Sequence, residues 1–229
     1  EKALIDFSTQ FATGPQEQAK AFYNIVSSGV TDTAKALGVL KQSKKAATAG
    51  IVDIDTAARG LISSVNSYAG TGLDASVASD ILFTAVREGR TTFVELADNI
   101  GRVASICSVA CVEFAELAGT LAFVTKSGIN TDEAVVGLRG LLTSVIGPTK
   151  DVANFAKKLG IDFSAAALKA KGLGGFLEDL AAKTNGSVTA MRKLFPNVRA
   201  FNIAVKVAGG DLADFNRILR ETSNAAGAT

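Results

Sequence analysis

Apolar residues recur along most of this chain with the spacing of an α-helix. The segment DASVASDILFTAVREG shows the pattern most clearly, because its apolar residues come in pairs that repeat every four residues. These pairs are Val77/Ala78, Ile81/Leu82 and Ala85/Val86. Such pairs form one apolar stripe along a helix, and the stripe predicts a face that packs on a core.

The same spacing occurs elsewhere, so the prediction extends to most of the chain. Apolar stripes cover residues 61–68, 114–121 and 134–145, and shorter apolar stretches lie near residues 7–11, 22–26 and 34–40. No comparable strand pattern, in which apolar and polar residues alternate, is present. We therefore predict an all-α fold, a multi-helix array without a sheet, built from helices of roughly 10 to 16 residues.

Four predicted junctions between helices share a glycine, an aliphatic residue and a capping residue. They are Gly50-Ile51-Val52-Asp53, Gly72-Leu73-Asp74, Gly128-Ile129-Asn130-Thr131 and Gly160-Ile161-Asp162. Glycine adopts the left-handed conformation that ends a helix, and the aliphatic residue packs against one of the joined helices. The Asp, Asn or Thr then caps the next helix. These tight turns predict antiparallel or steeply crossed neighbours, and their unequal spacing argues against a strict solenoid.

Two prolines predict further breaks. Gly147 and Pro148 follow the apolar run LLTSVI, and Pro148 cannot continue that helix but suits the first turn of the next. Pro196 divides two more apolar stretches within KLFPNVRAF. We place a subdomain boundary at Pro148. The expected parts are an N-terminal helical segment (1–50), a helical core (51–147) and a C-terminal helical subdomain (148–229).

The composition is that of an ordinary globular protein. Hydrophobic residues make up 48% and charged residues 20% of the 229 residues, unlike the composition of disordered chains. The 24 basic and 22 acidic residues are mixed along the chain, so the net charge of +2 predicts no sustained field that attracts nucleic acid or acidic lipid. No uncharged run approaches the ~20 apolar residues that span a bilayer, and we expect no signal peptide within this sequence.

The chain contains no histidine, which removes the most common general base and metal ligand. Its two cysteines, Cys107 and Cys111, are four residues apart, a spacing that places both on one face of a helix. A two-thiolate metal site needs two more ligands, and neither histidine nor further cysteine is available for it. We interpret both as small buried residues.

The stretch AKGLGGFLEDL, residues 170–180, contains three glycines and a lysine ahead of a helical pattern. A phosphate-binding loop needs two glycines with four residues between them, followed by Lys and Ser or Thr, or G-x-G-x-x-G after a strand. Here Lys171 precedes the glycines, and SAAALKA before them is helical in pattern. We predict a hinge between helices at 165–171 and 176–183, and no nucleotide site.

Two carboxylate pairs and one lysine cluster are the remaining candidates for chemistry. The pairs are Glu113 with Glu116 and Glu178 with Asp179, and the cluster spans Lys41–Lys45. A hydrolase can use one protonated and one ionised acid, but each pair lies beside apolar helical positions where a solvated face is expected. The lysines are interpreted as a solvated helix end. We predict no catalytic, cofactor-binding or metal site and no enzymatic activity.

The order of residues from 67 to 142 is more specific than the composition. It includes a helix end at Gly89, the TTFVEL start of the next helix, the run GRVA at 101–104 and the turn at 128–134. From about Val39 to the C-terminus, including LGIDFSAAALKAKGLGGFLEDLAAKTNG and LFPNVRAFNIAVKVAGG, the chain resembles the core region of bacteriophage tail tape measure proteins of the lactococcal-siphophage type. Cys107 and Cys111 depart from that family, where Pro, Ala or Gly is expected.

This resemblance implies a fragment of a structural protein from a phage or prophage tail. Such a protein lies in the lumen of the growing tail, sets its length and leaves ahead of the DNA during infection. The implied locations are the virion tail and, during assembly, the cytoplasm of the bacterial host. The implied partners are the tail tube protein, tail assembly chaperones, tail tip proteins and other copies of the chain in a homo-oligomer. No cofactor is implied.

Two other classes of function stay open beside this one: a helical scaffold or binding module, and a membrane-active helical assembly. A single helix of 229 residues would extend to ~340 Å, whereas a compact domain of this size has a radius of gyration near ~17 Å. The glycine turns favour the compact form. We therefore expect a folded helical module that rearranges or self-associates inside a tail tube, rather than the extended ruler.

Overall fold

The computed structural model describes residues 14–229, and helices form all of the regular structure in that range. It contains thirteen α-helices and one 3-10 helix, and no strand. The helices are α2 Pro15–Ser27, α3 Thr33–Gly50, α4 Ile54–Ser67, η1 Ala69–Thr71, α5 Ala75–Glu88, α6 Phe93–Asn99, α7 Gly101–Val109, α8 Phe114–Lys126, α9 Thr131–Ile146, α10 Lys150–Lys158, α11 Ala165–Thr184, α12 Val188–Leu194, α13 Val198–Ala208 and α14 Leu212–Ser223. The all-α prediction is confirmed. The helix expected near residues 7–11 lies outside the described range.

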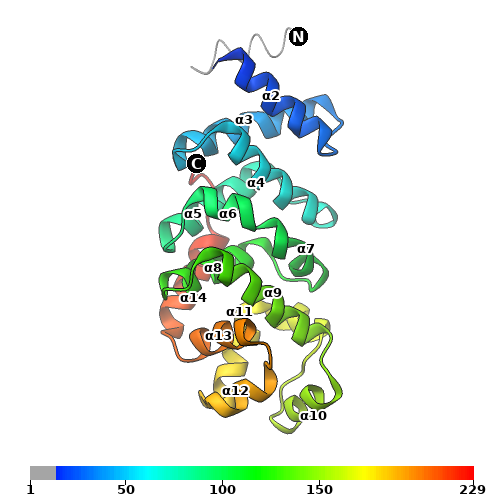
Figure 1. Ribbon diagram of the computed structural model, residues 1–229, viewed down its shortest axis with the longest axis vertical. Coiled ribbons are helices and arrows are strands. Elements are labelled where there is room, and N and C mark those ends of the chain that lie inside the picture. Colours follow the sequence, from blue (N-terminus) through cyan, green and yellow to red (C-terminus); the bar gives the residue numbers. More distant parts are fainter. Residues whose placement is uncertain (1–13) are drawn as a thin grey trace.

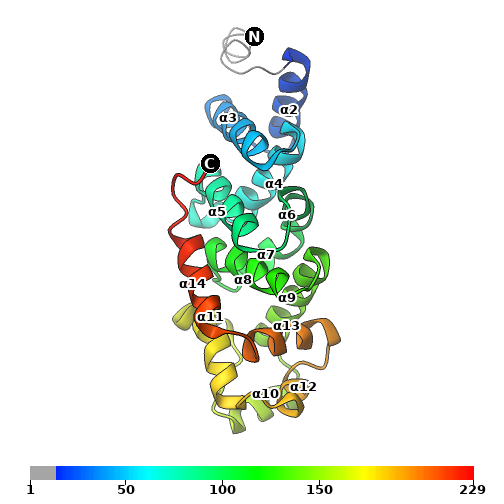
Figure 2. The ribbon, with the colours of Figure 1, turned by 90° about the vertical axis from the view of Figure 1, so that its left-hand side faces the viewer.

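The helices stack into an elongated molecule, with α2 at one end and α10 and α12 at the other (Figure 1). The chain then turns back along the stack. Helix α13 packs on α9, and α14 packs on α8 and α5, so the C-terminal residues lie beside α5 (Figures 1 and 2). The proposed division at Pro148 stays a prediction, and the returning helices link residues 198–223 to the central layers.

One apolar core runs through the stack. Its largest fully buried side chains include Tyr68, Phe93, Phe176, Phe195 and Phe215. Aromatic rings connect helices that are distant in sequence, since the rings of Tyr68 at the end of α4 and Phe114 at the start of α8 lie 5.4 Å apart in an edge-to-face arrangement. The stripe predicted on α5 is confirmed for most of its residues, but Val77 is 46% exposed.

Two of the four glycine junctions have the predicted left-handed glycine, but only the first also has the predicted cap, because Asn130 before α9 makes no side-chain capping hydrogen bond. Gly72 and Gly128 have positive φ angles of 74° and 95°. Asp74 then caps α5, because its carboxylate accepts the N–H of Ser76 at 2.7 Å. The local sequence predicts the left-handed glycine correctly at these two turns, where an added Cβ would meet nothing within 4 Å.

The junction at residues 50–53 differs from the prediction. Gly50 is the last residue of α3, and Ile51 takes the left-handed conformation with φ 54°. A Cβ at position 50 would lie 2.9 Å from the Cβ of Phe93, so the glycine permits the close approach of α6. The helix therefore ends one residue later. Ile51 is 93% exposed, and Val52 packs against the core in its place.

The junction at residues 160–164 also departs from the prediction. Gly160 has φ 71° and Ile161 is buried, as expected. However, Ser164 caps α11 instead of Asp162, by accepting the N–H of Ala167 at 3.1 Å. The extra residues place the ring of Phe163 in the core, 5.7 Å from Phe176 and 5.6 Å from Phe195.

Both proline breaks are present, and they lie between helices. Pro148 stands two residues before α10, which Thr149 caps by accepting the N–H of Val152 at 3.4 Å, so it is outside the first turn. Pro196 separates α12 from α13. Helix lengths vary more than the expected 10 to 16 residues, from 7 in α6 to 20 in α11.

We expect Gly137→Ala to lower the free energy of unfolding. A Cβ on Gly137 of α9 would lie 2.8 Å from the carbonyl oxygen of Arg199 on α13, so the two helices must separate. Overpacking of this kind costs about 1–3 kcal/mol. Denaturant unfolding followed by circular dichroism measures the change.

The matched control is Gly38→Ala on the exposed side of α3, where an added Cβ meets nothing within 4 Å. It should raise stability by roughly 0.5–1 kcal/mol, because alanine favours a helix over glycine. Equal destabilisation by both substitutions would contradict the close packing of α9 and α13.

Candidate functional site

The glycine stretch that first suggested a phosphate loop forms a kink inside α11. Gly172 has the non-helical angles φ 70° and ψ 170°, so the predicted hinge is confirmed at this residue. A carboxylate oxygen of Glu116, from α8, accepts the N–H of Gly174 at 3.3 Å. Lys171 pairs with Asp179 at 2.6 Å. The backbone donor and the cation that a phosphate would use are therefore bound by carboxylates of this chain.

The first carboxylate pair caps a helix. Glu113 is exposed, as predicted, and precedes α8, while Glu116 is half-buried. The other oxygen of Glu116 accepts the N–H of Glu113 at 3.4 Å, which forms a capping box. Glu116 thus joins the start of α8 to the kink in α11. The expectation of a solvated face is wrong for Glu116, because the kink folds over it.

The second carboxylate pair is half-buried, so its predicted exposure is also wrong. Glu178 accepts a hydrogen bond from the amide of Asn216 on α14. Asp179 pairs with Lys171 and with Lys183, the latter at 3.1 Å. Burial raises the pKa of Asp179, but the hydrogen bonds from the two lysines outweigh it and bring the pKa below its usual value. Glu178 therefore joins α11 to α14, whereas Asp179 pairs within α11, with one lysine before the kink and one after it.

The cysteines do not share a helix face. Cys107 is buried in α7, and burial raises the pKa of its thiol well above the ordinary value. Cys111 follows the end of α7, has φ 60° and is exposed, so the prediction of burial is wrong for it. The N–H of Val112 returns to the carbonyl of Cys107 at 2.9 Å and turns the chain there. Among residues 14–229, no group of three His, Cys, Asp or Glu side chains could hold a metal.

The lysine cluster at 41–45 lies within α3 rather than at a helix end. Lys41 and Lys45 are exposed, as a solvated face requires, and Lys44 is half-buried. Within residues 14–229 none of the three forms an ion pair.

A groove that the sequence did not predict lies beside α5 and the turn between α7 and α8. Its volume is about 630 Å³, and a smaller cavity of about 400 Å³ continues it toward α14. The apolar lining consists of Tyr68, Leu73, Val77, Ile81, Val112 and Phe114. Cys111, Glu113 and Lys169 line both cavities. Cys111 is a free, exposed cysteine at the point where the two cavities meet.

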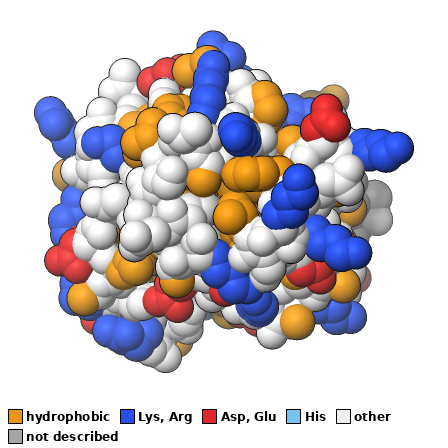
Figure 3. Space-filling view, turned by 90° about the horizontal axis from the view of Figure 1, so that it is seen from below, with side chains coloured by type: hydrophobic (Ala, Val, Ile, Leu, Met, Phe, Trp, Pro, Cys, Tyr) orange, Lys and Arg blue, Asp and Glu red, His pale blue; other side chains and the backbone are white. Residues whose placement is uncertain are grey.

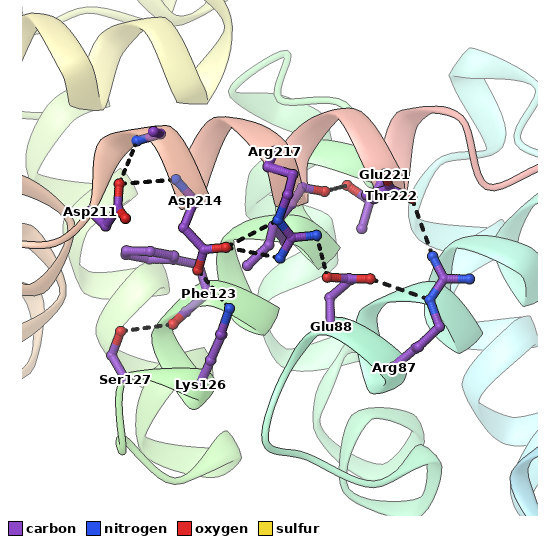
Figure 4. A network of polar contacts seen from close by, with 12 residues as sticks. Arg87, Glu88, Phe123, Lys126, Ser127, Asp211, Asp214, Arg217, Glu221 and Thr222 are labelled. Atoms are coloured by element: carbon purple, nitrogen blue, oxygen red, sulfur yellow. Dashed lines mark hydrogen bonds and ion pairs between the residues drawn. The ribbon is translucent and has the colours of Figure 1, made fainter.

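A network of charged side chains joins α14 to α5 and α8 (Figure 4). Arg217 donates to Glu88 of α5 at 2.7 Å and to Asp214 at 2.8 Å. Lys126 of α8 also pairs with Asp214, at 2.7 Å. Burial raises the pKa of Glu88, but hydrogen bonds from Arg217 and Arg87 outweigh it and lower the pKa below 4.5. The network attaches the returning C-terminal helix to the middle of the stack.

Glu116 and Glu178 thus bind groups on other helices, and the sequence-selected carboxylates and glycines serve the packing of an all-α chain. It belongs to the family of phage-related minor tail proteins, whose family model matches residues 1–196. The resemblance to tail tape measure proteins is confirmed. Membership of this family indicates a structural role in a phage tail and favours a non-enzymatic protein.

A curated relative is also a phage tail protein. The chain is 26% identical over 165 residues to the tape measure protein of Pneumococcus phage Dp-1. The match covers 69% of this chain and 14% of that protein, so the chain spans about one seventh of its relative's length. No solved structure matches the chain. Within residues 14–229 no helix combines the length and apolar character needed to cross a membrane.

We expect Gly172→Ala to destabilise the kink. The residue has positive φ, and an added Cβ would overlap the Glu116 carboxylate. A strained backbone position of this kind costs about 1–3 kcal/mol. Gly175→Ala, three residues later, is the control, because its Cβ would lie 3.5 Å from the Lys171 Cβ in ordinary contact. Thermal unfolding compares the stability of the two variants.

The kink should also bind no nucleotide. Calorimetric titration with ATP should therefore give no binding to either variant or to the parent chain. Detectable ATP affinity would contradict this interpretation.

The lowered pKa values of Glu88 and Asp214 predict loss of stability in acid. Hydrogen bonds from Lys126 and Arg217 bring the pKa of Asp214 below 3.8. Because both folded-state pKa values are depressed, this stabilisation is complete above the unfolded values of 4.5 and 3.8 and disappears as the pH falls through the folded values. Arg217→Gln should lower stability at pH 7 and flatten its decline between pH 5 and 3. An unchanged decline would show that the network does not contribute.

Proposed function

We propose that this chain is a segment of a tape measure protein, which occupies the lumen of a phage tail and sets the length of the tail. The main support is the match to the Dp-1 tape measure protein, which extends over 69% of the chain. The protein is then present in the virion tail and, during assembly, in the bacterial cytoplasm. Its partners are the tail tube protein, assembly chaperones, tail tip proteins and further copies of itself.

Within such a protein, this segment acts as a folded module and not as the extended ruler. The close contacts between α9 and α13 and between α8 and α14 fold residues 198–223 back on the centre of the chain. A ruler made of one continuous helix would instead be ~340 Å long for this segment. To lie inside a narrow tube, the module rearranges or associates with other copies.

In-frame deletion of residues 14–229 from the gene of the whole protein tests both parts of the proposal. Negative-stain electron microscopy would measure tail length and yield, with the parent gene supplied in trans as the control. We expect tail assembly to fail or tail length to lose its uniformity, because a folded module is missing. Normal tails of normal length and yield would contradict a role in tail assembly. Uniform shortening by ~320 Å, the length of these residues as one helix, would contradict the folded module and assign the segment to the extended ruler.

A further inference from the structure

Basic side chains gather at the end of the stack that α10 and α12 form. Residues 148–210 contain ten Lys and Arg and four Asp and Glu, a net charge of +6 in a chain whose total is +2. The even mixture of charges expected from the whole chain is therefore wrong for this segment. Five cations, Lys150, Lys157, Lys158, Arg192 and Lys193, lie on α10 and α12. Seen from this end, Lys and Arg side chains surround hydrophobic ones (Figure 3).

These five cations, which we call the basic end, are exposed and unneutralised. None of them forms an ion pair with a carboxylate of residues 14–229. Asp151 is the one acidic residue on α10 and α12, and Asp162 follows shortly after α10. On the sides of the stack, by contrast, Arg217, Lys126 and Lys171 each pair with a carboxylate within 3 Å. The basic end therefore keeps its positive potential.

Two of the cations lie over aromatic rings. The guanidinium carbon of Arg192 is 5.4 Å from the ring centre of Phe201 on α13. The ammonium of Lys193 is 5.2 Å from the ring centre of Phe155 on α10. Cation–π contacts of this kind restrain long side chains without neutralising their charge. Because these side chains are already restrained, they lose less conformational entropy when they bind a ligand than free side chains would.

We propose that the basic end binds the phosphate backbone of a nucleic acid without reading its sequence. Helix α10 has nine residues and is about 13 Å long, and duplex DNA carries one charge per ~1.7 Å of its axis, so several phosphates come within reach. Four of the five cations are lysines. Lysine is depleted in protein–protein interfaces but common in phosphate contacts. This inference goes beyond the tail-length role and does not depend on it.

Fluorescence anisotropy with a labelled 20-base-pair duplex tests the proposal between 20 and 200 mM salt. Five phosphate contacts predict a slope of log affinity against log salt of about −4 to −5, since each contributes ~0.9. A duplex of scrambled sequence should bind equally well. The double substitution Arg192→Gln, Lys193→Gln should weaken binding roughly tenfold or more at 50 mM salt and reduce the slope by about 2.

Lys41→Gln with Lys45→Gln provides the matched control, because these exposed lysines lie on α3 at the other end of the stack. It should leave affinity and slope unchanged, and circular dichroism should show that both double variants fold. No binding at 20 mM salt, or equal loss in the control, would overturn the proposal. Sedimentation velocity measures whether the chain self-associates. Salt-sensitive self-association that the α12 substitutions abolish would mean that the basic end binds a second copy of the chain, and this result would also overturn the proposal of nucleic-acid binding.

Discussion

The stack depends on close approach of helix backbones at positions that have no side chain. A Cβ on Gly60 of α4 would lie 2.7 Å from the Cβ of Ala97 on α6, and one on Gly119 of α8 would lie 2.6 Å from the hydroxyl of Thr222 on α14. Gly137 of α9 meets α13 in the same way. Because a methyl group does not fit at these points, each helix is fixed against its neighbour. The returning C-terminal helices occupy one position along the stack for the same reason.

Charged groups divide into two kinds around this framework. Along the sides, Arg217, Glu88 and Asp214 neutralise one another and hold α14 in place. At the end formed by α10 and α12, the cations have no such partner among residues 14–229. The charged groups along the sides therefore stabilise the fold of the chain itself, whereas those at the end are free to bind a charged partner.

Local sequence predicted the helices and most of their ends, because periodicity and capping act over a few residues. The failures occur where tertiary contacts decide. Gly50 stays helical where it lies against Phe93, and the left-handed turn falls at Ile51. Phe163 enters the core, and Ser164 rather than Asp162 caps α11. The groove beside Cys111 needs segments that are distant in sequence. The basic end, by contrast, was accessible from the charge of residues 148–210 alone.

In this structure the chain is a folded, elongated stack of helices and not an extended ruler. Small-angle X-ray scattering of residues 14–229 tests it most directly. The stack predicts a radius of gyration above the ~17 Å of a compact domain of this size but far below the ~50 Å of an unfolded chain. Its largest dimension should be a fraction of the ~320 Å that these residues would span as a single helix. A rod-like profile that approaches ~320 Å would show instead that the segment is an extended helix.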